Sequence, residues 1–224
     1  MKRLFAFVLA GLLCFGAAAQ ESNILQDWEE KIEGTDDGVV TPFSYINVLY
    51  CNNLAAPEGY SRHGWGLEFS TLHLGFNPWK NGRFSVGLLD VALDFGYLVG
   101  NYQFISTLDG KIVTSSIAPA GNKSQFTNVA FLFPVSYIQN FGDSKWSAAL
   151  QVSPGVGISS FTNENVVNNI RTKEKLNYSR GGGYFRLNLC AMIWYDNFGF
   201  VVRYGFPRGF QGAGVISAGL SFRL

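Results

Sequence analysis

Apolar and polar residues alternate along most of this 224-residue chain. The pattern is cleanest at the C-terminal end, where the alternating apolar residues are Ile216, Ala218, Leu220, Phe222 and Leu224. Because successive side chains of a β-strand point to opposite faces, each such segment predicts a strand with one apolar and one mostly polar face. The alternation and the turn residues between segments predict eight strands, near residues 43–51, 64–76, 83–106, 125–139, 145–160, 183–195, 198–207 and 213–224.

The connections between these segments fall into two length classes. Short turns follow the second, fourth and sixth segments, at residues 77–82, 140–144 and 196–197. Longer polar connections follow the first, third and fifth segments, at residues 52–63, 107–124 and 161–182. Outer-membrane barrels place short turns on one side and long loops on the other. We therefore expect an all-β fold, an eight-stranded antiparallel up-and-down transmembrane β-barrel.

The apolar faces are nearly unbroken and end in aromatic residues, whereas the opposite faces carry glycine, serine and scattered charges. Small residues suit a narrow barrel interior, and Tyr and Trp at strand ends suit the lipid–water interface. We therefore expect the apolar faces to point outward into lipid. The expected interface aromatics are Trp65, Trp79, Tyr97, Tyr137, Trp146 and Tyr195. A soluble lipocalin-like barrel, with the apolar faces turned inward, is the alternative fold.

Two segments depart from simple alternation. The apolar phase of segment 64–76 changes after Phe69, which predicts a β-bulge near Ser70 and Thr71, since one extra residue reverses the facing of all that follow. Pro154 interrupts the fifth segment and lacks an N–H donor for the ladder. We expect a bulge or an early strand break at Pro154.

The polar faces predict a lumen filled by side chains, because eight strands enclose only enough space for side chains. Six charged residues are expected to point into it: Glu68, Asp90, Asp94, Arg186, Arg203 and Arg223. Since a buried charge needs a partner, three acids and three bases predict a balanced network that blocks free flow. A narrow ion pathway through the same lumen is the alternative interpretation.

The N-terminal segment has the pattern of an export signal. Lys2 and Arg3 precede an apolar run that ends in small residues, which predicts a signal peptide over residues 1–19, cleaved before Gln20. An acidic periplasmic segment is expected over 20–40, and the barrel over 41–224. Without residues 1–19 the chain keeps 15 basic and 16 acidic residues, a net charge of −1, so no basic excess points to nucleic acid.

Composition and isolated reactive residues restrict the chemistry further. Aromatic residues make up 16% and charged residues 15% of the chain, against about 25% charged residues in globular proteins. Cys51 and Cys190 lie on separate strands, so no metal site, cofactor or disulfide framework is expected, although a single bridge between them stays open. His63 and His73, each near a serine, leave a lipid A acyltransferase or deacylase as a further alternative to a non-enzymatic barrel.

The C-terminal end resembles the insertion signal of bacterial outer-membrane barrels. A polar Ser217 is followed by Gly219, Phe222 and a terminal Leu224, with Leu in place of the usual final Phe. The chain from residue 41 resembles small eight-stranded outer-membrane proteins of the OmpA/OmpX class and the porin-like barrels of Bacteroidota. The resemblance implies insertion by the barrel-assembly machinery into the outer membrane of a Gram-negative bacterium.

The same resemblance implies contact with outer-membrane lipids and lipopolysaccharide, and a surface for envelope or host contacts on the long loops. The connection over 161–182 is polar and cationic, with Arg171, Lys173, Lys175 and Arg180. These residues indicate either contact with anionic lipopolysaccharide or a solvated loop. The sequence does not identify an oligomeric state.

Partitioning tests the outward orientation of the apolar faces. We expect the mature protein to leave membranes only in detergent and to show heat-modifiable gel mobility, because its outer surface needs an apolar solvent. Recovery as a dissolved monomer without detergent would contradict this orientation.

Overall fold

The computed structural model describes residues 44–53, 58–71, 73–79, 81–108, 112–116, 122–142, 144–167, 170–176, 183–207 and 214–224. The expected signal peptide of residues 1–19 and acidic segment of residues 20–40 lie outside these ranges. All regular secondary structure in the described ranges is β-strand. Within them, no helix is long and apolar enough to cross a membrane.

The strands in these ranges vary from 4 to 22 residues in length. They are β1 (Tyr45–Asn53), β2 (His63–Ser70), β3 (His73–Trp79), β4 (Gly82–Gly87), β5 (Asp90–Tyr97), β6 (Gln103–Ser106), β7 (Ile112–Ser115), β8 (Lys123–Leu132), β9 (Val135–Asn140), β10 (Trp146–Val167), β11 (Ile170–Leu176), β12 (Gly183–Tyr195), β13 (Phe198–Pro207) and β14 (Val215–Arg223).

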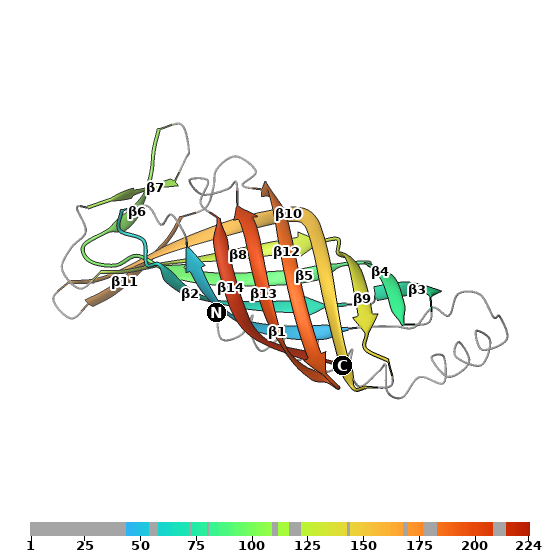
Figure 1. The fold of residues 1–224 in the computed structure, drawn as a ribbon. Coiled ribbons are helices and arrows are strands. Elements are labelled where there is room, and N and C mark those ends of the chain that lie inside the picture. The colour runs from blue at the N-terminus through green and yellow to red at the C-terminus, as the bar shows by residue number, and fades with distance from the viewer. Residues whose placement is uncertain are drawn as a thin grey trace, which may run out of the picture. The chain divides into compact units, whose positions relative to one another are not determined.

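Eight of these strands close into an antiparallel barrel, in the order β1, β2, β5, β8, β10, β12, β13 and β14 (Figure 1). The ring closes where β14 pairs with β1, from Tyr45 opposite Arg223 to Asn53 opposite Val215. Each barrel strand pairs with the barrel strands that precede and follow it along the chain. The predicted eight-stranded, antiparallel, up-and-down barrel is therefore confirmed.

Four of the remaining strands extend the sheet at its two ends, which we call the turn end and the loop end, and β6 and β7 form a separate two-stranded sheet. At the turn end, β9, β4 and β3 continue outward from β10 (Figure 1). At the loop end, β11 pairs with the far half of β10, and β6 pairs with β7. The predicted loops 107–124 and 161–182 thus contain strands β7 and β11, which the sequence analysis missed. β7 is only four residues long and β11 is exposed along nearly its whole length, so neither shows the alternation of a barrel strand.

The predicted change of phase near Ser70 is present and has a counterpart on the neighbouring strand. Inward side chains follow even numbers up to Ser70 in β2 and odd numbers from His73 in β3. The partner changes phase in the same way between Gly87 of β4 and Asp90 of β5. The pairs Ser70–Asp90 and His73–Gly87 keep one register, so both strands bend together. The second change of phase was not predicted.

The expectation of a bulge or strand break at Pro154 was wrong. β10 runs unbroken through Pro154, which pairs with Leu187 of β12. The interruption lies instead across the other edge of β10, between β8 and β9, where the Phe133 N–H donates to the Pro154 carbonyl at 2.8 Å. Because proline has no N–H group, Pro154 cannot donate a hydrogen bond back to the neighbouring chain. The strand interruption therefore lies in that neighbouring chain, between β8 and β9, and not in β10.

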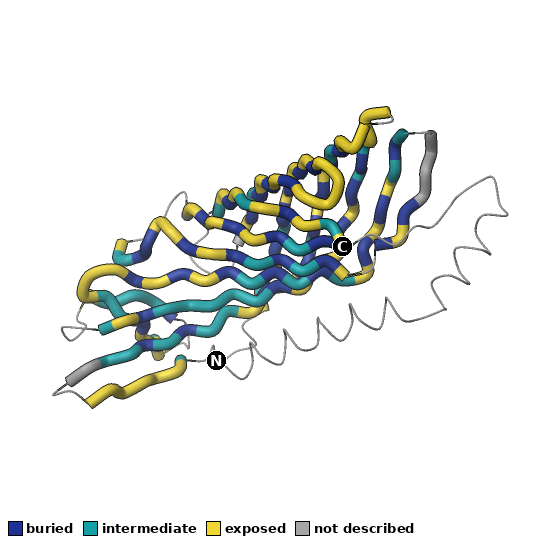
Figure 2. Tube along the Cα trace, turned by 90° about the horizontal axis from the view of Figure 1, so that it is seen from below, coloured by how far each residue is buried: buried dark blue, intermediate teal, exposed yellow. Residues whose placement is uncertain are grey.

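Burial alternates along most of the barrel strands (Figure 2), and the exposed positions carry most of the large apolar residues. In β12, Arg186, Cys190 and Trp194 are buried, whereas Phe185 and Tyr195 are exposed. The outward apolar row from Phe185 to Tyr195 spans eleven residues, which corresponds to roughly 25 Å along the barrel axis at the usual strand tilt. The lipocalin-like alternative, with apolar faces inward, is therefore wrong.

Gly219 sits where two barrel strands approach too closely for any other residue. It pairs with Leu49 across the closing seam between β14 and β1. A Cβ atom at this position would lie 2.8 Å from the Val48 carbonyl carbon and 2.9 Å from the Leu49 Cα, both of them backbone atoms. Such contacts require a backbone shift. Gly219 thus has a structural role in barrel closure besides the part it is expected to play in insertion.

Substitution of this glycine tests the seam. We expect Gly219→Ala to lower the free energy of unfolding by about 1–3 kcal/mol, because the backbone of β1 must move to admit a methyl group. The measurement is urea unfolding in detergent, in which the loss of the heat-modifiable gel band reports the unfolded fraction. The neighbouring Ala218→Gly, at an exposed position on the same strand, is the control and should cost at most about 1 kcal/mol. Equal effects of the two substitutions would contradict the close approach.

Candidate functional site

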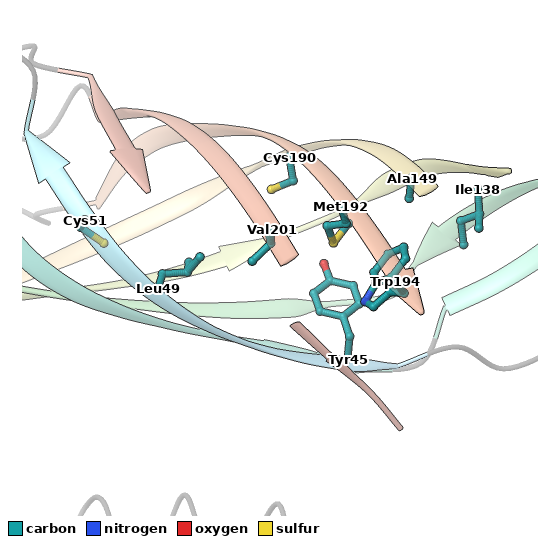
Figure 3. Packing of buried hydrophobic residues seen from close by; sticks show 9 residues of the cluster. All are labelled: Tyr45, Leu49, Cys51, Ile138, Ala149, Cys190, Met192, Trp194 and Val201. Carbon is teal, nitrogen blue, oxygen red and sulfur yellow. The ribbon is translucent and has the colours of Figure 1, made fainter. Parts of the chain in front are cut away.

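The lumen of the barrel is the candidate functional site, and its turn end is packed with apolar side chains. Trp194, Met192 and Ile138 lie there, and the ring of Tyr45 extends among them (Figure 3). The Trp194 indole N–H donates to Ser221 Oγ at 2.9 Å. This cluster fills the barrel interior beside the short turns.

Arg203 of β13 is the centre of the charged part of the lumen. Its Nη1 lies 3.0 Å from Glu68 Oε2, and its Nη2 lies 2.5 Å from Asp94 Oδ1. The guanidinium therefore bridges two acids from β2 and β5, on strands that are distant from β13 in the sequence. Arg203 and Glu68 are buried to about 1% and 0% exposure, so each depends on the other for charge compensation.

A second arginine completes the pairing of Asp94. Arg186 Nη1 lies 2.5 Å from Asp94 Oδ2, so the two oxygens of this carboxylate face two different guanidinium groups. Arg186 Nε also donates to Asn188 Oδ1 at 2.9 Å, which holds the arginine along the wall of β12. Fixed donors of this kind give short, charge-assisted hydrogen bonds.

Tyr45 connects this centre to a third acid, Asp90. The Tyr45 hydroxyl lies 2.9 Å from Asp90 Oδ2 and 3.2 Å from Glu68 Oε1, and Gln151 Nε2 donates to it at 2.7 Å. His73 Nε2 lies 3.0 Å from the other Asp90 oxygen. Tyr45, Gln151 and His73 were not predicted as network members. For Tyr45 and Gln151 the available signal was an inward position on a barrel strand.

The network contains five of the six charged residues that were expected in the lumen. Glu68, Asp90, Asp94, Arg186 and Arg203 are all buried there. The sixth, Arg223, also points inward, but at the turn end: its Nη2 lies 3.1 Å from Ser147 Oγ and its guanidinium stacks 4.5 Å from the Trp194 ring centre. His73, which the sequence analysis did not expect in the network, contacts Asp90.

The two cysteines belong to the same layer of the lumen. Cys51 and Cys190 are both buried and both free, so the single bridge left open by the sequence is not formed. Cys51 pairs in register with Ser217, Ser217 with Arg203, and Arg203 with Cys190. Two strands therefore separate the thiols around the wall. Among the described residues, no cluster of three or more His, Cys, Asp or Glu side chains is suited to hold a metal.

An aromatic cluster occupies the loop end of the lumen. Phe104 of β6 is 1% exposed and contacts Phe161, with ring centres 4.9 Å apart; Tyr60 and Phe126 surround it. The side chain of Asn163 on β10 forms two hydrogen bonds with the backbone of Phe104. Its Oδ1 accepts from the Phe104 N–H at 2.9 Å, and its Nδ2 donates to the Phe104 carbonyl at 2.7 Å. The β6–β7 hairpin is thereby anchored to the extended part of β10.

The histidines do not form a catalytic relay with the serines beside them. Ser70 Oγ and Asp90 Oδ1 both contact the same ring nitrogen of His73, Nε2, at 2.8 and 3.0 Å. A Ser–His–Asp relay needs the serine on one ring nitrogen and the acid on the other. His63 is exposed on the outside, where its Nδ1 contacts the Tyr50 hydroxyl, and Ser61 Oγ bonds the backbone of His63.

The predicted interface aromatics lie in two groups on the outer surface. Tyr50, Trp65 and Tyr97 are exposed near the loop end, where the Tyr50 and Trp65 rings meet edge to face. Trp146 and Tyr195 are exposed at the turn end and also contact each other edge to face. Tyr137, also at the turn end, is partly buried, and the side chain of Trp79 lies outside the described part of the structure. That these groups meet a lipid–water interface stays a prediction.

The other two residues of the predicted insertion signal lie at the turn end of β14. Phe222 is exposed and packs edge to face on Phe198, with ring centres 5.5 Å apart. Leu224 is exposed, and its backbone N–H donates to the Ser44 carbonyl at 3.0 Å. Recognition of Gly219, Phe222 and Leu224 by an assembly machinery stays a prediction.

Comparisons with known proteins give only distant similarities. No protein-family model matches the sequence, and no curated protein matches it. Similar solved structures include Ail of Yersinia pestis in complex with the heparin analogue sucrose octasulfate, at 8% identity over 82% of this chain and 97% of Ail, with a TM-score of 0.42. Neisserial surface protein A matches at 9% identity over 82% of this chain and 96% of its own, with a TM-score of 0.40.

The outer-membrane enzyme PagL is also similar, at 13% identity over 80% of this chain and 98% of PagL, with a TM-score of 0.37. Similarities this distant carry no argument about activity. The fold assignment for this chain rests on its own strand pairing.

Removal of the central arginine tests the lumen network. We expect Arg203→Met to lower the free energy of unfolding by about 3–5 kcal/mol, because it leaves Glu68 buried without its cation. The double variant Arg203→Met/Glu68→Gln should recover part of this loss. Urea unfolding in detergent provides the measurement.

The matched control for Arg203→Met is Lys145→Met, which removes an exposed pair with Asp196 of 3.5 Å and should cost about 0–1 kcal/mol. A loss from Arg203→Met no larger than that of the control would show that the network contributes little to stability.

Proposed function

We propose that the protein is an integral outer-membrane β-barrel with a filled lumen, and that its role is to present a structured surface at its loop end. This proposal rests on the contrast between the outer and inner surfaces of the barrel wall. The outside is an apolar surface of exposed Phe, Leu, Val and Ile, whereas the inside is a buried, paired charge network. A soluble protein does not expose an apolar surface that surrounds the whole barrel.

Closure of the ring supports the same proposal. Backbone N–H and C=O groups in hydrocarbon cost several kcal/mol each when unpaired, so only helices or closed barrels span a membrane. Every barrel strand of this chain pairs along both edges with its neighbours in the ring. The long connections then face the exterior and the short turns face the periplasm, as in other outer-membrane barrels. We include in this proposal a relationship to the OmpA/OmpX-like proteins or to the porin-like barrels of Bacteroidota.

The filled lumen favours a structural role over transport. Trp194 and Tyr45 occupy the turn end, Arg203 and its acids the middle, and the cluster around Phe104 the loop end. A continuous aqueous pathway would have to displace each of these layers. The contacts of His73 likewise favour charge compensation over hydrolysis, since one ring nitrogen serves both Ser70 and Asp90.

Electrical recording tests the filled lumen. We expect the reconstituted full-length protein to give no stable openings of the size that general porins show in planar bilayers, because eight strands leave room only for side chains. A general porin reconstituted in the same way is the positive control. The variant Arg203→Ser/Glu68→Ser removes a buried ion pair as a whole, and small openings should become more frequent in it. Stable porin-sized openings of the unaltered protein would contradict the proposal.

A further inference from the structure

Beyond the barrel proper, β8, β10 and β11 continue at the loop end as a three-stranded antiparallel sheet. Its rows of side chains follow from the register. Lys123 pairs with Glu164 and Glu164 with Lys173, and the next row toward the barrel joins Gln125, Thr162 and Lys175. Since side chains in paired positions point to the same face, each row lies on one side of the sheet.

The inner side of this sheet is already occupied. Phe161 and Asn163 of β10 point inward, where they hold Phe104 of β6, and Leu176 of β11 packs against the same aromatic cluster. The side chains that alternate with these residues must therefore point outward. The outer side is accessible, and the exposed side chains described on the inner side are those of Ile170, Thr172 and Glu174 of β11.

The outer side is strongly cationic. Its exposed basic residues are Lys123, Arg171, Lys173 and Lys175, which we call the cationic face. The acid among them is Glu164, whose Oε1 lies 2.5 Å from Arg171 Nη2. Four positive charges against one negative charge leave a net charge of +3 on these five residues. The alternative interpretation of this segment is a solvated loop, and such a loop would not need its basic residues on one side of the sheet.

The cationic face continues the apolar outer surface of the barrel. Thr162 and Glu164 alternate in phase with Val156 and Ile158 of the same strand, which are exposed on the outside of the barrel. Tyr97, one of the interface aromatics, pairs with Gln125 and so lies in the row of Lys175. The row of Lys123 and Lys173 is two residues further out, about 7 Å along the strand.

This spacing agrees with the depth of lipid headgroups. A bilayer has a hydrocarbon core of about 30 Å and a total thickness of about 40–45 Å, so each headgroup layer is roughly 5–8 Å deep. With Tyr97 at the boundary of the hydrocarbon, Lys123 and Lys173 lie beyond it on the side of the headgroup phosphates, and the long side chain of Lys175 can extend in the same direction. Charge complementarity and continuity with the apolar surface thus point to the same occupant.

We propose that the cationic face binds the phosphorylated headgroups of the glycolipids that surround the barrel in the outer leaflet. This inference rests on the proposed membrane insertion and assigns the lipid contact to named residues. The acyl chains lie along Val156 and Ile158, while Lys123, Lys173 and Lys175 donate charge-assisted hydrogen bonds to the phosphates. Arg171 is held by Glu164 at the far end of the face, next to the glycolipid sugars.

The test uses the full-length protein in phosphatidylcholine nanodiscs titrated with bisphosphorylated lipid A, with bound copies counted by native mass spectrometry. We expect the triple variant Lys123→Gln/Lys173→Gln/Lys175→Gln to weaken lipid A binding by roughly fivefold per lysine, about a hundredfold in all. The matched triple Lys→Arg variant should retain binding. Lys145→Gln, which alters an exposed lysine beside the turn at the other end of the barrel, should leave it unchanged.

Three results would overturn the assignment. They are unchanged binding in the triple Lys→Gln variant, an equal loss in Lys145→Gln, and equal retention of lipid A and its dephosphorylated form by the unaltered protein. Binding of a soluble sulfated polysaccharide that is lost in the same variant, without any preference for lipid A, would assign the face to an extracellular polyanion instead. Heat-modifiable mobility is measured on every sample, so that failed insertion, which contradicts the proposed function itself, is distinguished from failed lipid binding.

Discussion

Closure of the hydrogen-bonded ring determines how the side chains of this barrel divide between the lumen and the exterior. Once β14 pairs with β1, each barrel strand has a partner on both edges, and side chains can point only into the lumen or away from the barrel. Most large apolar residues are on the outside, so the middle of the lumen receives small, polar and charged ones. A narrow interior without bulk water then obliges Glu68, Asp94 and Arg203 to compensate one another.

This arrangement reverses the usual division between core and surface. The lumen is held by ion pairs and hydrogen bonds in its middle and by aromatic packing at both ends, with Trp194 near the turns and Phe104 near the loops. The outer surface gains nothing from burial within the protein itself, and its apolar residues become favourable only in an apolar solvent. The backbone ladder and the lumen network are therefore the parts of the molecule that specify its shape.

The loop end shows how one strand serves two environments. Along β10, outward residues change from Val156 and Ile158 to Thr162 and Glu164 without any change of phase, while the inward residues change from Gln151 to Phe161 and Asn163. The sheet thus continues past the apolar surface and keeps its two sides distinct. Its inner side anchors the β6–β7 hairpin, and its outer side carries the cationic face.

Alternation along the chain predicted the eight barrel strands, the outward direction of the apolar faces and the change of phase at Ser70, because it reports directly which side chains share a face. The same alternation indicated that five charged residues, now found buried in the lumen, point inward. Which of these residues meet depends on the folded barrel, since Arg203 contacts Glu68 and Asp94 from strands far away in the sequence. The roles of Tyr45 and His73, the β6–β7 and β10–β11 hairpins, and the requirement for glycine at position 219 likewise depend on strand register and close approach, which no local pattern encodes.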